Sequence, residues 1–148
     1  MRLVPYEVKH LDEIMVVEMD NLKEIANISP KELMIMTADK SLCMTAVDDD
    51  DQVVFIIGLN QLWGKVYEAW LLISPLIQLY KKSSIRLMKQ LKAQLVNSIG
   101  FQRVQADIRA DLQTNIEFVK YFGFKFEGAM LKYGVNGETY LRYSIVGD

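Results

Sequence analysis

Two runs of like charge are the largest groups of side chains that could do chemistry. One is acidic and extends from Asp48 to Asp51. The other is basic and consists of Lys81, Lys82, Arg86, Lys89 and Lys92. The acidic run has the charge of a calcium loop but lacks the spaced ligands and the glycine of an EF-hand, so we interpret it as a solvated turn. The basic run indicates a local site for anions.

His10 and Cys43 are the only residues of their types in the chain. Without partners they cannot build a zinc site, so no metal is expected. His10 lies where the first helix begins and is interpreted as a capping or surface residue. A single cysteine excludes an intrachain disulfide and favours a reducing, cytoplasmic location, and Cys43 itself is expected in the core.

Length and composition indicate one soluble globular domain that spans residues 1–148. The chain is 51% apolar and 24% charged, and no apolar run is long enough to cross a bilayer. The N-terminus lacks the pattern of a signal peptide. A net charge of −2 argues against general nucleic-acid binding.

Hydrophobic periodicity predicts the elements of the first half. The acidic run is expected to be a hairpin turn, and the last strand to be buried on both faces. Trp63 and Trp70 are interpreted as core or sheet-packing aromatics. In chain order we expect an edge strand at 2–8, helices at 11–25 and 31–36, and strands at 42–47, 53–59 and 65–73.

The second half repeats helix and strand signals. Ser83 or Ser84 is expected to cap a long helix that ends at Gly100, and Thr114 a short helix closed by Gly123. The Asn136-Gly137 pair predicts a hairpin turn with positive φ at both residues. The expected elements are a strand at 103–108, a helix at 115–122 and strands at 124–131 and 138–146.

This order predicts an α/β (α+β) fold with a mostly antiparallel central sheet, flanked by helices. The long helix between two neighbouring strands indicates one parallel pair. Three segments resemble the GCN5-related N-acetyltransferases in order and spacing. They read LVPYEVKHLDEI, VVFIIGLNQLWGKVYEAWLLIS and NIEFVKYFGFKFEGAMLKYGVNGETYLRYSI. A narrower resemblance is to acetyltransferase-like proteins encoded by tailed phages, including virion proteins.

The resemblance implies that acetyl-CoA is the cosubstrate. The backbone of Leu71, Leu72 and Ile73 would pair with the pantetheine arm, and the pyrophosphate would bind at the start of the long helix. In the family motif for that turn, Gln78 fits the first position, but Lys81 stands where the family has glycine and Ser83 where it has glycine or alanine. Together with Lys82 and Ser84 they could bind phosphate through side chains and N–H groups, or could form an ordinary solvated helix start.

The resemblance also implies catalytic positions. Glu68 matches a glutamate that often acts as the base, with a surface carboxylate beside Lys65 as the alternative interpretation. The usual tyrosine acid falls on Val119, so Tyr121 is the substitute candidate. The asparagine that begins the short helix falls on Leu112, and Asn115 is the nearby cofactor candidate. Tyr133 and Tyr140 could line an acceptor pocket or pack half-buried.

Two functions follow from this resemblance. The first is transfer of an acetyl group from acetyl-CoA to an unidentified amine. The second is an inactive phage protein of the same fold that acts in the virion or binds a host protein. A homodimer through the C-terminal strands, with Tyr140, Leu141 and Tyr143, fits either function.

Overall fold

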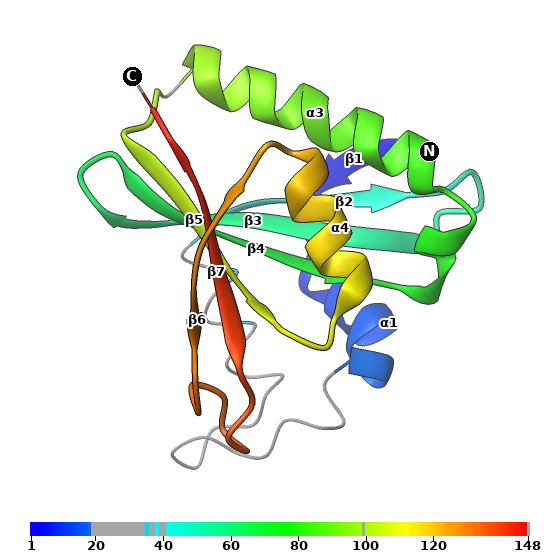
Figure 1. The fold of residues 1–148 in the computed structure, drawn as a ribbon. Helices are drawn as coiled ribbons and strands as arrows, with labels where there is room; N and C mark the ends of the chain where they lie inside the picture. Colours follow the sequence, from blue (N-terminus) through cyan, green and yellow to red (C-terminus); the bar gives the residue numbers. More distant parts are fainter. Residues whose placement is uncertain (19–34, 36–37, 39–40, 99, 148) are drawn as a thin grey trace. The chain divides into compact units, whose positions relative to one another are not determined.

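The computed structural model describes residues 1–18, 35, 38, 41–98 and 100–147 (Figure 1). Its elements are β1 (Arg2–Pro5), α1 (Val8–Glu18), β2 (Ser41–Val47), β3 (Val53–Trp63), β4 (Val66–Ile73), the 3-10 helix η1 (Pro75–Gln78), α3 (Lys81–Ser98), β5 (Arg103–Arg109), α4 (Gln113–Tyr121), β6 (Lys125–Met130) and β7 (Tyr140–Val146). The predicted helix at 31–36 and the end of the predicted helix at 11–25 lie outside the described residues.

The strands form a seven-stranded sheet in the order β1-β2-β3-β4-β5-β7-β6. β4 and β5 are parallel, whereas β1 with β2, β2 with β3, β5 with β7 and β6 with β7 are antiparallel. The predicted fold class, with its single parallel pair, is confirmed. The chain packs as two compact units: unit 1 is Met1–Asn60 with Leu71–Ser84, and unit 2 is Gln61–Trp70 with Ile85–Asp148.

The core of unit 1 is built on β3. Val54, Phe55 and Ile56 are fully buried on consecutive positions, so both faces of this strand are covered. Leu11 from α1 is also fully buried. Pro5 ends β1, which stands at the edge of the sheet, where a strand residue without an N–H is tolerated.

His10 caps the start of α1, which confirms one of its two predicted roles. The Glu7 N–H donates to His10 Nδ1 at 3.0 Å, and the His10 N–H donates to the Glu7 carbonyl at 2.9 Å. The first of these bonds is one half of a capping box, in which the side chain three residues into the helix accepts the N–H of the residue before the helix. His10 is only 6% exposed, and its Nδ1 also lies 2.9 Å from the hydroxyl of Thr45 on β2. The histidine therefore ties the helix start to the sheet.

Unit 2 has one apolar and one polar sheet face. Ala106 of β5 and Tyr143 of β7 pack against Ile116 and Val119 of α4, and Ala69 of β4 joins this cluster. Strand neighbours point to opposite faces. The residues that alternate with this cluster therefore share the other face: Glu68, Gln105, Asp107, Arg142 and Ser144.

Three predicted details of the helices and turns are wrong. α3 begins at Lys81, so Ser83 and Ser84 lie inside its first turn and cap nothing. α4 begins at Gln113 after Leu112, with no side-chain cap, so Thr114 is within the helix. Positive φ occurs at Gly137 but not at Asn136, because β6 and β7 are joined by a longer loop rather than a two-residue turn.

Two burial predictions also need correction. Trp63 is 68% exposed, because β3 extends past the core as far as this residue. β4 is buried at its two ends, but its middle residues from Glu68 to Leu71 are only partly buried. Gly100 and Gly123 do have the positive φ, +65° and +85°, that their predicted capping roles require.

Candidate active site

The parallel pair separates at Glu68. Pairing joins Val66 to Arg103, Tyr67 to Val104 and Glu68 to Gln105, and the described strands pair no further although both continue. Glu68 therefore occupies the last paired position before β4 and β5 part.

The surroundings of Glu68 raise the pKa of its carboxyl above the usual 4.5. Burial contributes most, followed by the negative charge of Asp107, while Arg142 and a hydrogen bond from Gln105 act in the opposite direction. The side-chain oxygen Oε1 of Gln105 accepts from Arg103 Nε at 3.0 Å, which leaves the side-chain NH₂ group of Gln105 to donate to Glu68. No ion pair joins Glu68 to any cation in the described part of the chain. Glu68 itself is partly buried.

A second carboxylate of unit 2, that of Glu127, accepts hydrogen bonds at both of its oxygens. Arg103 donates to both oxygens of Glu127 at 2.6 Å, and the Ser144 hydroxyl donates to the same group. These bonds lower the pKa of Glu127 to about 2. Glu68 and Glu127 are thus chemically opposite: one holds its proton more tightly than a free glutamate, the other less.

We expect Glu127 to contribute to stability in a pH-dependent way. Its pKa falls from 4.5 to about 2 on folding, so its contribution is present above pH 4.5 and is lost as the pH falls toward 2. Urea unfolding of the wild type and of Glu127→Gln at pH 7 and pH 3 would measure this. The difference in unfolding free energy should shrink at pH 3, and a difference independent of pH would contradict the assignment.

The predicted phosphate site lies in unit 1, at the start of α3. Ser84 N–H bonds to the Tyr80 carbonyl at 2.8 Å, so Lys81, Lys82 and Ser83 form the first turn. Their N–H groups have no carbonyl partner within the helix. Lys81 and Lys82 are exposed, whereas Ser84 is fully buried, with its hydroxyl 3.9 Å from the Met1 sulfur. Lys81, Lys82 and Ser83 are therefore placed to meet an anion, and the Ser84 side chain is not.

Four further predicted cofactor residues precede this turn. Leu72 and Ile73 are buried and Leu71 partly so, as expected of residues whose backbone rather than side chains would meet a ligand. Gln78 ends η1 and is exposed. The hydroxyl of Ser74, between Ile73 and Gln78, is buried and has no hydrogen-bond partner among the described residues.

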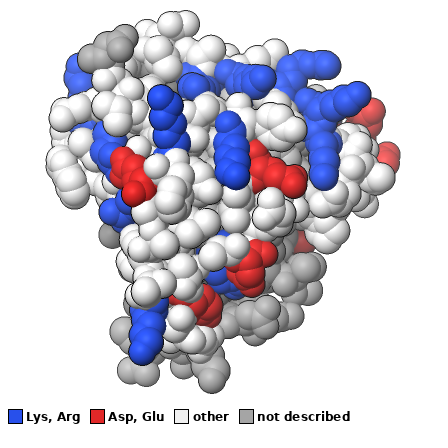
Figure 2. Space-filling view, viewed as in Figure 1, with Lys and Arg blue, Asp and Glu red and all other residues white. Residues whose placement is uncertain are grey.

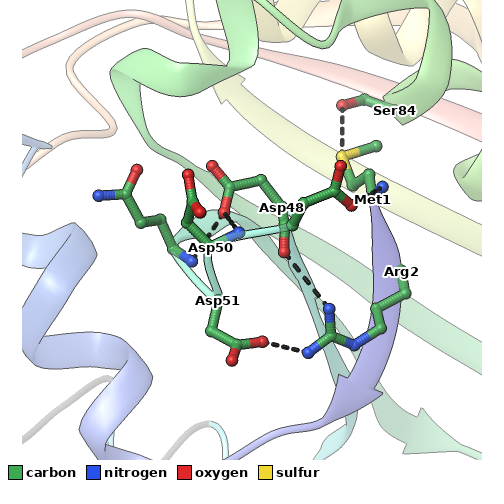
Figure 3. Close-up of polar contacts among 8 residues, drawn as sticks. Met1, Arg2, Asp48, Asp50, Asp51 and Ser84 are labelled. Carbon is green, nitrogen blue, oxygen red and sulfur yellow. Dashed lines mark hydrogen bonds and ion pairs between the residues drawn. The ribbon is translucent and has the colours of Figure 1, made fainter.

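The acidic turn lies beside the start of α3 within unit 1 (Figure 3). Asp48 Oδ1 accepts the N–H groups of Asp50 and Gln52 at 2.9 Å, which confirms the predicted turn and explains how Asp48 can be buried. Burial and the charges of this turn raise the pKa of the Tyr80 hydroxyl, directly before α3. The negative charges of this turn would repel an anion that binds at the start of α3.

α3 itself is rich in basic side chains. Figure 2 shows Lys and Arg side chains gathered over α3, a helix whose sequence KKSSIRLMKQLKAQLVNS contains five cations and no acidic residue. Lys92 is engaged, because its Nζ donates to the Phe122 carbonyl at 2.6 Å, at the end of α4. At the predicted anion site, Lys81 and Lys82 would therefore attract an anion, whereas the acidic turn would repel it.

The residues predicted on α4 differ in accessibility. Val119, at the position of the family acid, belongs to the apolar cluster. Tyr121 is the last residue of α4 and is 61% exposed. Asn115 lies in the first turn and is partly buried.

The tyrosines near the C-terminus fall into two groups. Tyr133 and Tyr140 contact edge to face, with ring centroids 5.3 Å apart, and Tyr133 is 55% exposed. Tyr143 is only 4% exposed, and Leu141 packs against the same apolar cluster. Of the three residues predicted to support a homodimer, only Tyr140 has its side chain outside this core.

Sequence reasoning missed Asp107 and Arg142. Arg142 donates to both oxygens of Asp107, at 2.8 and 2.9 Å, directly across β5 and β7. The only signal was the alternation of charged and apolar residues in RVQADIR and YLRYSIV. Among the described residues no cluster suited to a metal ion is found, and no helix is long and apolar enough to span a membrane.

Several solved structures share this fold. A spermidine N-acetyltransferase from Vibrio cholerae superposes with a TM-score of 0.73 at 13% identity, covering 99% of this chain and 95% of that one. A GNAT-family acetyltransferase from Bacillus anthracis gives 0.71 at 14% identity, with coverage of 99% and 95%. A Streptococcus mutans protein gives 0.70 at 17%, with 99% coverage of both chains.

No known family profile matches the chain, and no curated protein matches it significantly. At these identities the structural likeness establishes the fold. The chain therefore has the fold of the GCN5-related N-acetyltransferases along nearly its whole length.

Proposed function

We propose that this protein transfers an acetyl group from acetyl-CoA to an amine, with Glu68 as the general base. One observation carries the proposal: in an acetyltransferase fold, a partly buried carboxylate with a raised pKa occupies the point where the parallel strands separate. A carboxyl tuned upward in this way is a better proton acceptor near neutral pH. The structural neighbours described as acetyltransferases support the same reaction class.

In the proposed reaction the amine nitrogen attacks the thioester carbonyl. A C–N bond forms, the C–S bond breaks, and Glu68 accepts the proton that the attacking nitrogen loses. The CoA thiolate takes one proton from an acid or from water. Tyr121 is the candidate donor, although a thiol of ordinary acidity, with a pKa of about 8.5, leaves readily as thiolate without one. The burial of Val119 at the usual acid position therefore does not exclude turnover.

Binding of the cosubstrate is proposed at residues of unit 1. The first-turn N–H groups of α3 and the ammonium groups of Lys81 and Lys82 would meet the pyrophosphate. The backbone of Leu71, Leu72 and Ile73 would pair with the pantetheine arm, and Gln78 completes the proposed set in this unit. Asn115, on α4 of unit 2, stays a separate cofactor candidate. These residues suit a phosphate-bearing group despite the missing glycines, because backbone donors do not depend on residue type.

Calorimetric titration with acetyl-CoA and with CoA tests the proposal. We expect saturable binding that Lys81→Ala/Lys82→Ala weakens about tenfold or more, because each charge-assisted contact contributes roughly 1.5–3 kcal/mol. Lys120→Ala/Lys125→Ala removes the same charge at two exposed lysines elsewhere and should leave the affinity unchanged. Absence of binding at millimolar CoA would refute the proposal.

One observation favours a second candidate, a non-catalytic binding protein of the same fold. Lys81 and Ser83 occupy the glycine positions of the phosphate turn, and the acidic turn lies beside it. Such a protein would bind a partner in place of CoA, and the resemblance to phage proteins makes a virion or host protein that partner. Detection in purified virions, together with absent CoA binding, would favour this candidate.

A further inference from the structure

We propose that Asp107 and Arg142 form a positioning pair that controls the charge state of Glu68. The inference rests on the proposed function in one respect, since Glu68 is the base of that reaction. The electrostatic relation itself is a property of unit 2 and can be measured without any substrate.

The sheet register places the three groups on one face. Glu68 pairs with Gln105, and Asp107 follows two residues later on β5, so Glu68 and Asp107 point to the same side. Arg142 on β7 stands directly opposite Asp107. Its Nε and Nη2 donate to the two carboxylate oxygens at 2.8 and 2.9 Å. These two hydrogen bonds hold the guanidinium group of Arg142 on Asp107 rather than on Glu68.

Partial burial makes this arrangement effective. The Asp107 side chain is 10% exposed and that of Arg142 is 33% exposed, so solvent screens their charges less than it would on an open surface. Among the described residues, the charged groups that act on Glu68 are Asp107 from β5 and Arg142 from β7, and Gln105 donates a hydrogen bond to it. Asp107 has the larger influence of the two charges, so the pair as a whole favours the protonated carboxyl.

Asp107 and Arg142 act on the pKa of Glu68 in opposite directions. Replacing each of them should therefore move the titration midpoint of Glu68 in opposite directions. Asp107→Asn removes the negative charge and frees Arg142, so the titration midpoint of Glu68 should move to lower pH. Arg142→Gln removes the cation and leaves Asp107 uncompensated, so the midpoint should move to higher pH. A residue that only held the fold together would not move the midpoint in opposite directions.

The measurement is a carbon-13 NMR titration of side-chain carboxyls in the free protein, with the Glu68 signal identified by its loss in Glu68→Gln. Glu117→Gln is the matched control, because it neutralises an exposed carboxylate on α4 of the same unit and should leave the Glu68 midpoint unchanged. Should Arg142→Gln fold poorly, Asp107→Asn/Arg142→Gln removes both charges together. Its Glu68 midpoint should lie above that of Asp107→Asn.

An unchanged midpoint in both single variants, or movement in the same direction, would overturn the inference. For an active enzyme, the acid limb of the kcat/KM profile should follow the NMR midpoint in each variant. If the protein transfers no acetyl group to any amine, the proposed function fails. The NMR titration then still decides the electrostatic relation, so the two failures are distinguishable.

Discussion

Replacing Glu68 by glutamine should lower kcat/KM for acetyl transfer about 10²–10⁴-fold, the usual contribution of a positioned general base. Glutamine keeps the shape of the side chain and its hydrogen bonding to Gln105 but cannot accept the amine proton. The loss should appear mainly in kcat, because the proton moves only as the amine attacks. Steady-state kinetics with the acceptor amine found in a substrate screen would measure it.

The pH dependence gives a sharper criterion than the rate alone. Glu68 must be ionised to act, and burial with the neighbouring Asp107 raises its pKa above 4.5. The rate should therefore rise with pH through a midpoint higher than that of a free glutamate. This acid limb should vanish in Glu68→Gln. Retention of the limb would show that another group is the base.

Two controls separate chemistry from folding. A carboxyl whose pKa is raised in the folded state destabilises the fold once it is ionised. Glu68→Gln should therefore leave the free energy of unfolding at pH 7 unchanged or increase it. Glu127→Gln makes the same chemical change at a carboxylate whose pKa is lowered, so it should retain turnover while losing some stability.

The sequence predicted the fold well because its signals are local and repeated. The acidic run between two apolar strands became a turn, with Asp51 at a φ of +60°, and the long helix between two strands required the parallel pair. The errors concern features that depend on competing neighbours. Leu112 rather than Thr114 precedes α4, and the chain begins α3 before its serines.

The site was predictable only in part. Glu68 could be named because the resemblance marks its strand, but its pKa depends on residues far along the chain. Asp107 and Arg142 meet only through the register of β5 and β7, which no local pattern specifies. Likewise, the acidic turn interacts with Met1 and with Tyr80, the residue before α3. Both are remote from the turn in sequence, so no local pattern could predict these contacts.

The two aromatics of β3 illustrate the same limit and allow a direct test. Phe55 is fully buried in the core of unit 1, whereas Trp63, near the hairpin with β4, is 68% exposed. We expect Phe55→Ala to lower the free energy of unfolding by about 3–5 kcal/mol, through lost burial and the cavity it leaves. Trp63→Ala should change it by roughly 0.5 kcal/mol or less, because an exposed side chain leaves no cavity.

Urea unfolding followed by circular dichroism would compare both variants with the wild type at one pH. Residue size alone predicts the reverse order, since tryptophan has more apolar surface to bury than phenylalanine. A Trp63→Ala variant as unstable as Phe55→Ala would therefore mean that the end of β3 is covered in solution. A self-associating sheet end could cover it, and the loss of stability would then depend on protein concentration. Independence of concentration, together with a small effect, would establish Trp63 as a surface residue.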